Sequence, residues 1–130
     1  MQLAQDTKYL SANVINVAKS FNDAQVKLLV PVKDHLTWLD LSRSGITDQA
    51  AADLGQLSKL TKLHLENTVI SDKTLQEIGK LENLEYLNLY GTKVTDEGLQ
   101  NLENLKKLKK LYVWQTGVTQ AGVDKLMSAV

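Results

Sequence analysis

A 24-residue repeat runs through most of this chain and limits what it can fold into. Full copies begin at Leu36, Leu60 and Leu84, and a slightly shorter copy begins at Leu108. Each copy opens with leucines in the pattern LxxLxL, except that valine takes the last of these positions in the fourth copy. A unit this short cannot bury its own apolar side, so consecutive units must stack and share one core. The repeat therefore predicts a solenoid.

Each copy contains signals for one strand and one helix. The second and third leucines are two residues apart, which is the spacing of side chains on one side of a strand. Ten residues after the first leucine, an apolar residue precedes a threonine or serine, usually followed by aspartate, as in Ile46-Thr47-Asp48. This pattern is typical of a helix N-cap with a carboxylate in the first turn. Apolar residues at helical spacing follow: Ala51, Leu54 and Leu57; Leu75, Ile78 and Leu81; Leu99, Leu102 and Leu105; Val123 and Leu126. The chain is thus predicted to be an α/β leucine-rich repeat solenoid, with parallel strands on the concave side and helices on the convex side.

The ninth position of each repeat carries a hydroxyl: Ser44, Thr68, Thr92 and Thr116. Hydroxyl groups in loops commonly hydrogen-bond to nearby backbone. We expect this column to bond the loop backbone of the neighbouring repeat and so form a ladder.

The whole chain, residues 1–130, reads as one domain. Residues 12–35 align as a degenerate repeat, with Ile15 and Val17 at strand positions, Phe21 at the apolar loop position and Asn22-Asp23 at the cap. Five parallel strands are therefore expected. Residues 1–11 fall where a preceding helix would lie and are expected to form an N-terminal cap or the remainder of an earlier repeat. The full repeats are 36–59, 60–83 and 84–107, and the last is 108–130.

The outward positions of the strands form three columns when the repeats are stacked. These columns are Trp38, Lys62, Tyr86 and Lys110; Asp40, His64, Asn88 and Tyr112; Ser42, Glu66, Tyr90 and Trp114. Five of the seven aromatic residues lie there. Exposed tyrosine and tryptophan are enriched at protein interfaces, although aromatic residues also favour strands for their packing alone. We expect the eleven residues other than Ser42 to form a protein-binding face, centred on the aromatic C-terminal half.

Composition excludes several other functions. The fifteen basic and fifteen acidic residues balance, which gives no electrostatic case for nucleic acid as the main partner. The chain has no cysteine, so it cannot form disulfides, attach haem through Cys-x-x-Cys-His or bind zinc through thiolates. No stretch approaches the ~20 apolar residues of a membrane-spanning helix, so insertion of this segment is not expected.

A catalytic or metal site is not expected either. Asp40 and His64 occupy the same position on adjacent strands, about 5 Å apart, and Ser42 is close, so the residue types of a hydrolytic triad are present. The sequence offers no nucleophile on a strained turn and no glycine-rich oxyanion loop. His64, Glu66 and Asp40 are possible metal ligands, but one histidine with two carboxylates on an open sheet is a weak signal. We therefore assign no catalytic, cofactor or metal residues.

The phrases NTVISD, GTKVTDEGL, LEYLNLYGTKVTD and LKKLYVWQTGVT resemble a bacterial leucine-rich repeat frequent in Bacteroidetes and Planctomycetes, of the form LxxLxLxxTxVTDxGLxxLxxLxN. The resemblance covers residues 12–128. Such repeats often form C-terminal modules of large envelope proteins that also contain membrane helices and a cytochrome c-like domain. The resemblance implies a periplasmic or envelope location and a docking role; a chain complete as given would be cytoplasmic. The haem motif is absent from this sequence, so no haem ligand is assigned.

Two alternatives to a binding face for a separate protein remain. The module can be a structural spacer that packs against other domains of its own chain or self-associates, and the aromatic rings can stack on carbohydrate. The last strand, around Tyr112, has no following neighbour, but Lys109 and Lys110 beside it discourage strand addition. A monomer is expected.

Overall fold

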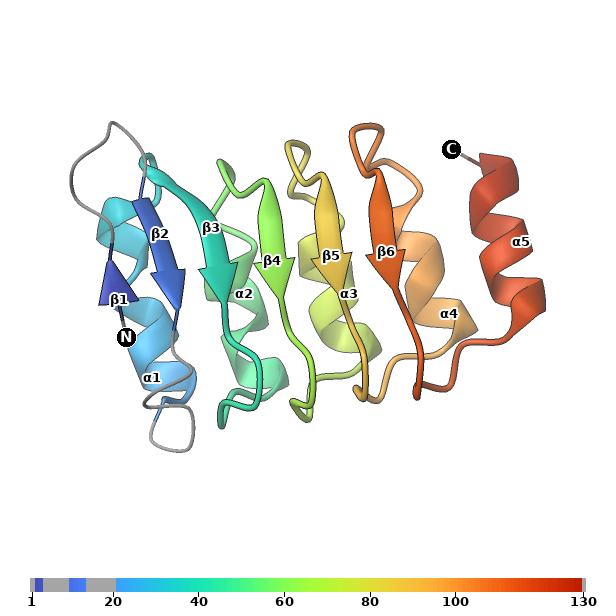
Figure 1. Cartoon of the computed structure of the whole chain (residues 1–130), viewed down its shortest axis with the longest axis horizontal. Coiled ribbons are helices and arrows are strands. Elements are labelled where there is room, and N and C mark those ends of the chain that lie inside the picture. Colours follow the sequence, from blue (N-terminus) through green and yellow to red (C-terminus); the bar gives the residue numbers. More distant parts are fainter. Residues whose placement is uncertain (1, 4–9, 14–20, 130) are drawn as a thin grey trace.

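The computed structural model describes residues 2–3, 10–13 and 21–129. It has one layer of strands and one layer of helices, side by side along the solenoid (Figure 1). The strands are β1 (Gln2–Leu3), β2 (Leu10–Asn13), β3 (Leu36–Asp40), β4 (Lys62–His64), β5 (Tyr86–Asn88) and β6 (Lys110–Tyr112). The helices are α1 (Asp23–Lys27), α2 (Ala51–Leu54), α3 (Asp72–Ile78), α4 (Asp96–Leu99) and α5 (Gln120–Ala129). Short 3₁₀ turns span Val30–Val32, Asp48–Ala50 and Gln100–Leu102.

The strands form one sheet in the order of the sequence. Strands β2 to β6 are parallel neighbours, as the repeat predicts, and β1 pairs antiparallel with β2. From β3 to β6 each residue pairs with the residue 24 positions later, for example Leu39 with Leu63 and Leu63 with Leu87. An α/β solenoid with five parallel strands is therefore confirmed within the described residues.

The N-terminal repeat differs from the prediction. The strand beside β3 is Leu10–Asn13, with Ala12 opposite Leu39, so this repeat is longer than the others rather than shorter. Ile15 and Val17, predicted at strand positions, lie outside the described residues. The prediction of a helix before this strand is wrong for the described part, because Gln2–Leu3 forms the strand β1. Pairing with β3, with an irregularity between Leu10 and Ser11, sets the register of this repeat.

The rest of the N-terminal repeat agrees with the sequence. Phe21 is buried, and Asn22 caps α1 by accepting a hydrogen bond from the backbone of Ala24. The Gln25 side chain in turn accepts a hydrogen bond from the Asn22 backbone, which completes a capping box.

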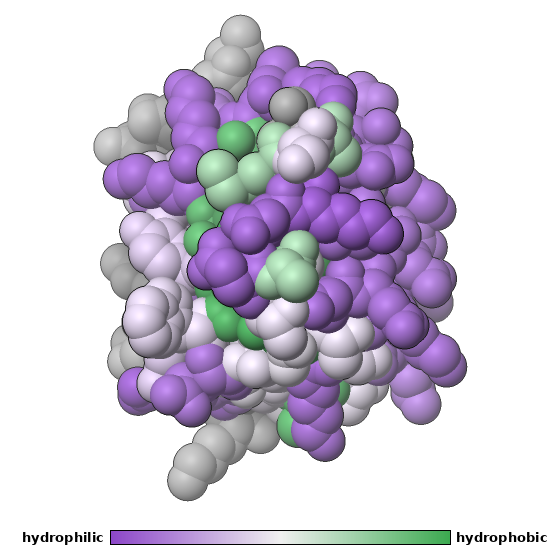
Figure 2. All heavy atoms as spheres, turned by 90° about the vertical axis from the view of Figure 1, so that its right-hand side faces the viewer, coloured by the Kyte–Doolittle hydropathy of each residue, from purple (hydrophilic) through white to green (hydrophobic). Residues whose placement is uncertain are grey.

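The core is a continuous row of leucine, isoleucine and valine between the two layers. The predicted helix residues are buried in every repeat, except that Val123 in α5 is partly exposed. The last repeat also leaves Leu108, Leu111, Val113 and Val118 partly exposed. Figure 2 shows this C-terminal end, where apolar side chains reach the surface between hydrophilic ones. No helix in the described part of the chain is long and apolar enough to cross a membrane.

Aspartates at the helix starts, rather than the hydroxyl column, join adjacent repeats. Asp48 accepts hydrogen bonds from Ser71 N at 2.8 Å and Ser71 Oγ at 2.5 Å, so the start of one helix holds the cap residue of the next repeat. The same arrangement links Asp23 to Thr47, Asp72 to Thr95 and Asp96 to Thr119. The Ser71 and Thr95 hydroxyls therefore donate to the preceding repeat, and these two residues make no side-chain cap hydrogen bond in their own helices.

The hydroxyl column was predicted to bond the neighbouring repeat, and this is wrong. Thr68, Thr92 and Thr116 each donate to the backbone carbonyl three residues earlier in their own repeat, at 2.8, 2.7 and 2.5 Å. Ser44 Oγ is buried and makes no hydrogen bond to a described residue. The reason is local: the chain turns back after the strand, which places the hydroxyl within hydrogen-bonding distance of the backbone carbonyl three residues earlier rather than of the next repeat.

Candidate binding face

The outward columns of the sheet lie in register as predicted. Backbone pairing aligns Trp38, Lys62, Tyr86 and Lys110 across β3 to β6, and it aligns Asp40, His64, Asn88 and Tyr112 in the same way. We call the surface formed by these side chains, together with Ser42, Glu66, Tyr90 and Trp114 just after the strands, the strand face. Parallel pairing without a bulge keeps every column on one side of the sheet, so all predicted residues are brought together.

Large aromatic side chains are exposed on the strand face. Trp38 is 51% exposed, Tyr90 42%, Tyr112 40% and Trp114 74%. Three of these four lie on or just after β5 and β6, which makes the C-terminal half of the face the more aromatic. Aromatic rings exposed to this degree bury large area when a partner covers them.

Lys62 on β4 already shows how this face holds a cation. Its Nζ lies 4.3 Å from the ring centroid of Trp38 on one side and 5.0 Å from that of Tyr86 on the other. The Tyr86 ring also contacts the ring of Tyr112 in the second column, with the two centroids 5.4 Å apart. Ammonium groups are attracted to aromatic faces at such distances. Lys62 therefore links the Trp38 and Tyr86 rings of the first column.

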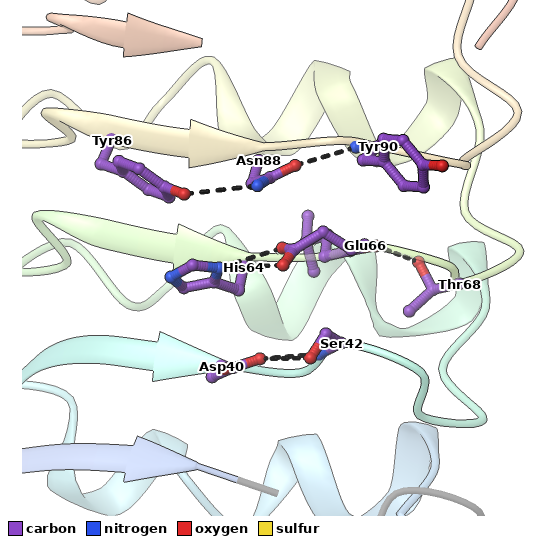
Figure 3. Close-up of polar contacts among 9 residues, drawn as sticks. Asp40, Ser42, His64, Glu66, Thr68, Tyr86, Asn88 and Tyr90 are labelled. Carbon is purple, nitrogen blue, oxygen red and sulfur yellow. Dashed lines mark hydrogen bonds and ion pairs between the residues drawn. The ribbon is translucent and has the colours of Figure 1, made fainter. Parts of the chain in front are cut away.

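His64 and Glu66 form an ion pair in the middle of the face (Figure 3). His64 Nδ1 lies 3.0 and 3.1 Å from the two carboxylate oxygens of Glu66, so Nδ1 carries a proton and donates. This hydrogen bond raises the pKa of His64 above its ordinary value of 6.5; the charges of Glu66 and Asp40 act in the same direction, while burial and Lys62 oppose them. The His64 ring also contacts Tyr86, with centroids 4.9 Å apart.

The chain just after the strands is held by polar side chains of the second column. Asp40 Oδ1 accepts from Ser42 N at 3.0 Å and Ser42 Oγ at 2.7 Å, and Asn88 Oδ1 accepts from Tyr90 N at 3.1 Å. Figure 3 shows these contacts at the ends of β3 and β5, with β4 between them. Such bonds to the residue two positions on stabilise a turn. They hold the backbone at Ser42 and Tyr90 and the hydroxyl of Ser42.

A groove of about 580 Å³ lies over the second and third columns. It is lined by Asp40, Ser42, Arg43, His64, Glu66, Asn67, Asn88, Tyr90, Tyr112 and Trp114. One side is polar, from the loops after β3 and β4, and the other is aromatic, from β6 and the loop after β5. Trp38, Lys62, Tyr86 and Lys110 lie outside it, so the predicted face is divided into a groove and a separate first column.

Sequence reasoning missed Arg43 and Asn67 in the groove. Both have a left-handed backbone, with φ of 61° and 56°, and so do Gly91 (φ 70°) and Gln115 (φ 57°) at the same position of the next repeats. Glycine and asparagine are the residues that favour this conformation. The occurrence of asparagine and glycine at this one repeat position, as Asn67 and Gly91, was the available signal for a tight loop next to the strand face.

The polar contacts in the groove do not form a catalytic relay. Ser42 Oγ donates to Asp40, while His64 Nδ1 is bonded to Glu66, so the histidine is not placed between the serine and the aspartate as in a hydrolytic triad. Among the described residues, no group of three or more histidine, aspartate or glutamate side chains is arranged to hold a metal ion. The groove thus presents hydrogen-bonding groups, charges and aromatic rings.

Comparisons with known proteins identify the repeat and the fold. A family model described as Leucine Rich repeat matches residues 80–102. No curated protein sequence matches the chain. The actin-binding site 2 of leiomodin-1 is similar in structure, with a TM-score of 0.68 and 16% identity over 92% of this chain and 79% of that one.

Two bacterial structures are also similar. Internalin C2 from Listeria monocytogenes has a TM-score of 0.55 and 20% identity over 92% of this chain and 67% of that one. A leucine-rich repeat protein of Leptospira interrogans has a TM-score of 0.53 and 21% identity over 80% of this chain and 31% of that one. At these identities the likeness is one of fold. The repeat match and the sheet topology together make this chain an α/β leucine-rich repeat solenoid, a fold commonly used for protein–protein interaction.

Proposed function

We propose that this chain is a non-catalytic module that binds a protein partner through the strand face. The observation that carries the proposal is the exposure of Tyr90, Tyr112 and Trp114 together along one side of the groove. Interface hot spots are enriched in such residues and surrounded by polar groups that fix orientation. His64 and Glu66 supply those groups beside the aromatic side. No cofactor is required for this function.

A double variant, Tyr90→Ala with Trp114→Ala, tests the proposal. Both side chains are exposed, so the variant is expected to unfold cooperatively with unchanged stability while it loses about 2 kcal/mol or more of binding energy for a true partner. The assay is affinity capture from an extract of the source cells, followed by binding measurements with the captured protein. Val69→Ala is a matched control, since Val69 is exposed but lies outside the groove. Equal capture by the double variant and the wild type would remove the strand face as the binding surface.

We further propose that the module belongs to a larger bacterial envelope protein and faces the periplasm. The support is the resemblance of its repeats to those of envelope proteins with a cytochrome c-like domain. Immunoblotting of fractionated source cells with an antibody to this segment, with haem staining of the same lane, tests the idea. A large, membrane-associated, haem-positive band is expected, whereas a soluble band near 14.5 kDa without haem would overturn it.

A second candidate function is packing against other domains of the same chain. The partly exposed apolar residues of the last repeat, including Leu111, Val113 and Val123, favour it. Self-association through this end is disfavoured by the exposed Lys109 and Lys110, so we propose a monomer. Sedimentation at increasing concentration distinguishes self-association from packing within one chain, because stable self-association would raise the measured mass with concentration.

A further inference from the structure

We propose that the groove receives an arginine or lysine side chain from an extended segment of the partner protein. The inference deepens the proposed function and rests on it. It commits to the charge of the group that enters the groove.

The polar side of the groove offers carboxylate oxygens. Asp40 uses Oδ1 for both of its hydrogen bonds to Ser42, and its Oδ2 makes no further hydrogen bond or ion pair with a described residue. Glu66 is held by His64 from one direction, and its carboxylate still lines the groove. The Asp40 carboxylate, with one oxygen left unbonded among the described residues and fixed beside the groove, favours a cationic group that donates hydrogen bonds.

The aromatic side of the groove offers faces for the same group. Tyr90, Tyr112 and Trp114 line it, and no lysine or arginine in the described part of the chain lies over their rings. The first column shows the corresponding arrangement filled from within, where Lys62 lies between Trp38 and Tyr86. The same sheet thus places a lysine between rings at one end of the strands, whereas at the other end Asp40 forms no ion pair with a described residue and no described lysine or arginine lies over the rings.

Besides His64, which is already paired with Glu66, Arg43 is the positive charge that argues for the opposite partner. It lines the groove from the loop after β3, is exposed, and forms no ion pair with Asp40 or Glu66. An acidic partner side chain would meet Arg43 but also both carboxylates. A basic side chain meets the carboxylates directly, while exposed Arg43 has room to turn into solvent. The Asp40 oxygen that makes no bond to a described residue and the aromatic wall therefore favour the basic group.

The experiment is a selection of peptides from a random library displayed on phage, using the whole 130-residue chain as bait. Binders are sorted by whether they still bind the Tyr90→Ala/Trp114→Ala variant. Those that depend on the two rings are then synthesised in pairs, with each arginine replaced by citrulline, which keeps the shape and removes the charge. Binding is measured for the wild type, Asp40→Asn and Arg43→Gln, with Asp53→Asn as a control carboxylate outside the groove.

The expected result is enrichment of arginine or lysine in the ring-dependent peptides. Citrulline and Asp40→Asn should each weaken their binding at least ten-fold, while Asp53→Asn has no effect and Arg43→Gln does not weaken it. Ring-dependent peptides that lack basic residues, or that bind equally with citrulline, would overturn this inference and leave the proposed function standing. Acidic ring-dependent peptides that need Arg43 would overturn it in favour of the opposite charge. A selection with no ring-dependent binder would count against both.

Discussion

Replacement of Asp48 by alanine tests how the repeats are held together. The change removes the acceptor of three hydrogen bonds, from Ser71 N at 2.8 Å, Ser71 Oγ at 2.5 Å and Thr74 Oγ1 at 2.7 Å. Thr74 is fully buried, so water cannot replace its partner, whereas half-buried Ser71 can recover part of its bonding. A hydrogen bond to a charged group contributes about 1.5–3 kcal/mol, and a buried donor left alone costs about 1–3 kcal/mol. We expect Asp48→Ala to lower the free energy of unfolding by about 3 kcal/mol, out of the ~5–15 kcal/mol typical of a domain.

Two further variants separate charge from hydrogen bonding. Asp48→Asn keeps an oxygen for Ser71 N and Thr74, and its amide can donate to the Ser71 hydroxyl, so a smaller loss of about 1 kcal/mol is expected. Asp53→Ala is the control, because the Asp53 side chain is half-buried on α2 and makes no hydrogen bond or ion pair to a described residue; its effect should stay within about 0.5 kcal/mol. The assay is urea unfolding followed by circular dichroism and tryptophan fluorescence. If Asp48→Ala loses no more stability than Asp53→Ala, the carboxylate does not join the repeats in the way argued.

The same carboxylate predicts how stability depends on pH. Burial acts to raise the pKa of Asp48, but hydrogen bonds from Ser71 and Thr74 outweigh it and hold the pKa below the ordinary value of 3.8. A pKa that is lower in the folded state means that the folded chain binds fewer protons, so this contribution is complete above about pH 3.8 and is lost as pH falls through the folded value. The stability difference between the wild type and Asp48→Asn should therefore shrink below pH 3.8 and stay constant above it. A constant difference through this range would contradict the assignment.

Three further changes test other parts of the structure. Gly98→Ala should destabilise by about 1–3 kcal/mol despite the better helix propensity of alanine, because the new Cβ would overlap Asp72 Oδ1 and lie 2.7 Å from Asp72 Cβ; equal or higher stability in urea would show that the carboxylate moves aside freely. Glu66→Gln should lower the pKa of His64 toward 6.5, measured by NMR titration of the ring, since the charged acceptor is removed; an unchanged pKa would assign the shift to another cause. Leu87→Ala, at a fully buried position of β5, should cost about 2–5 kcal/mol in the same urea assay, and a loss under 1 kcal/mol would mean that the core collapses around the gap.

Much of the fold follows from local pattern. The cap Thr47-Asp48 and the spacing of Leu54 and Leu57 predict a helix start and a buried helix side, because these are properties of a few consecutive residues. The columns of the strand face also follow, since a constant repeat length gives a constant register. The aromatic content of the candidate site was therefore predictable, and whether it binds a protein stays a prediction.

The contacts between repeats were not predictable in the same way. The sequence identifies Asp72 as a first-turn carboxylate, but nothing local shows that it bonds Thr95 rather than its own helix alone. By contrast, Asp40 with Ser42 and His64 with Glu66 are local pairs, two residues apart in the chain. Long-range partners are chosen by the distance between chain segments after folding, which a repeat pattern does not contain.

By itself, the sequence determined the repeat unit, the layer each segment occupies and the residues that line each column, because the period of hydrophobic side chains allows one stacked arrangement to bury them. Tertiary structure alone decided the register of the first repeat, the antiparallel β1 and the carboxylate links between helices. It also divided the strand face into a first column that contains Lys62 and a groove in which His64 pairs with Glu66, while exposed Arg43 forms no ion pair with a described residue. The physical reason is that burial patterns depend on neighbours along the chain, whereas hydrogen bonds and grooves depend on which atoms meet within a few ångströms once the repeats have stacked.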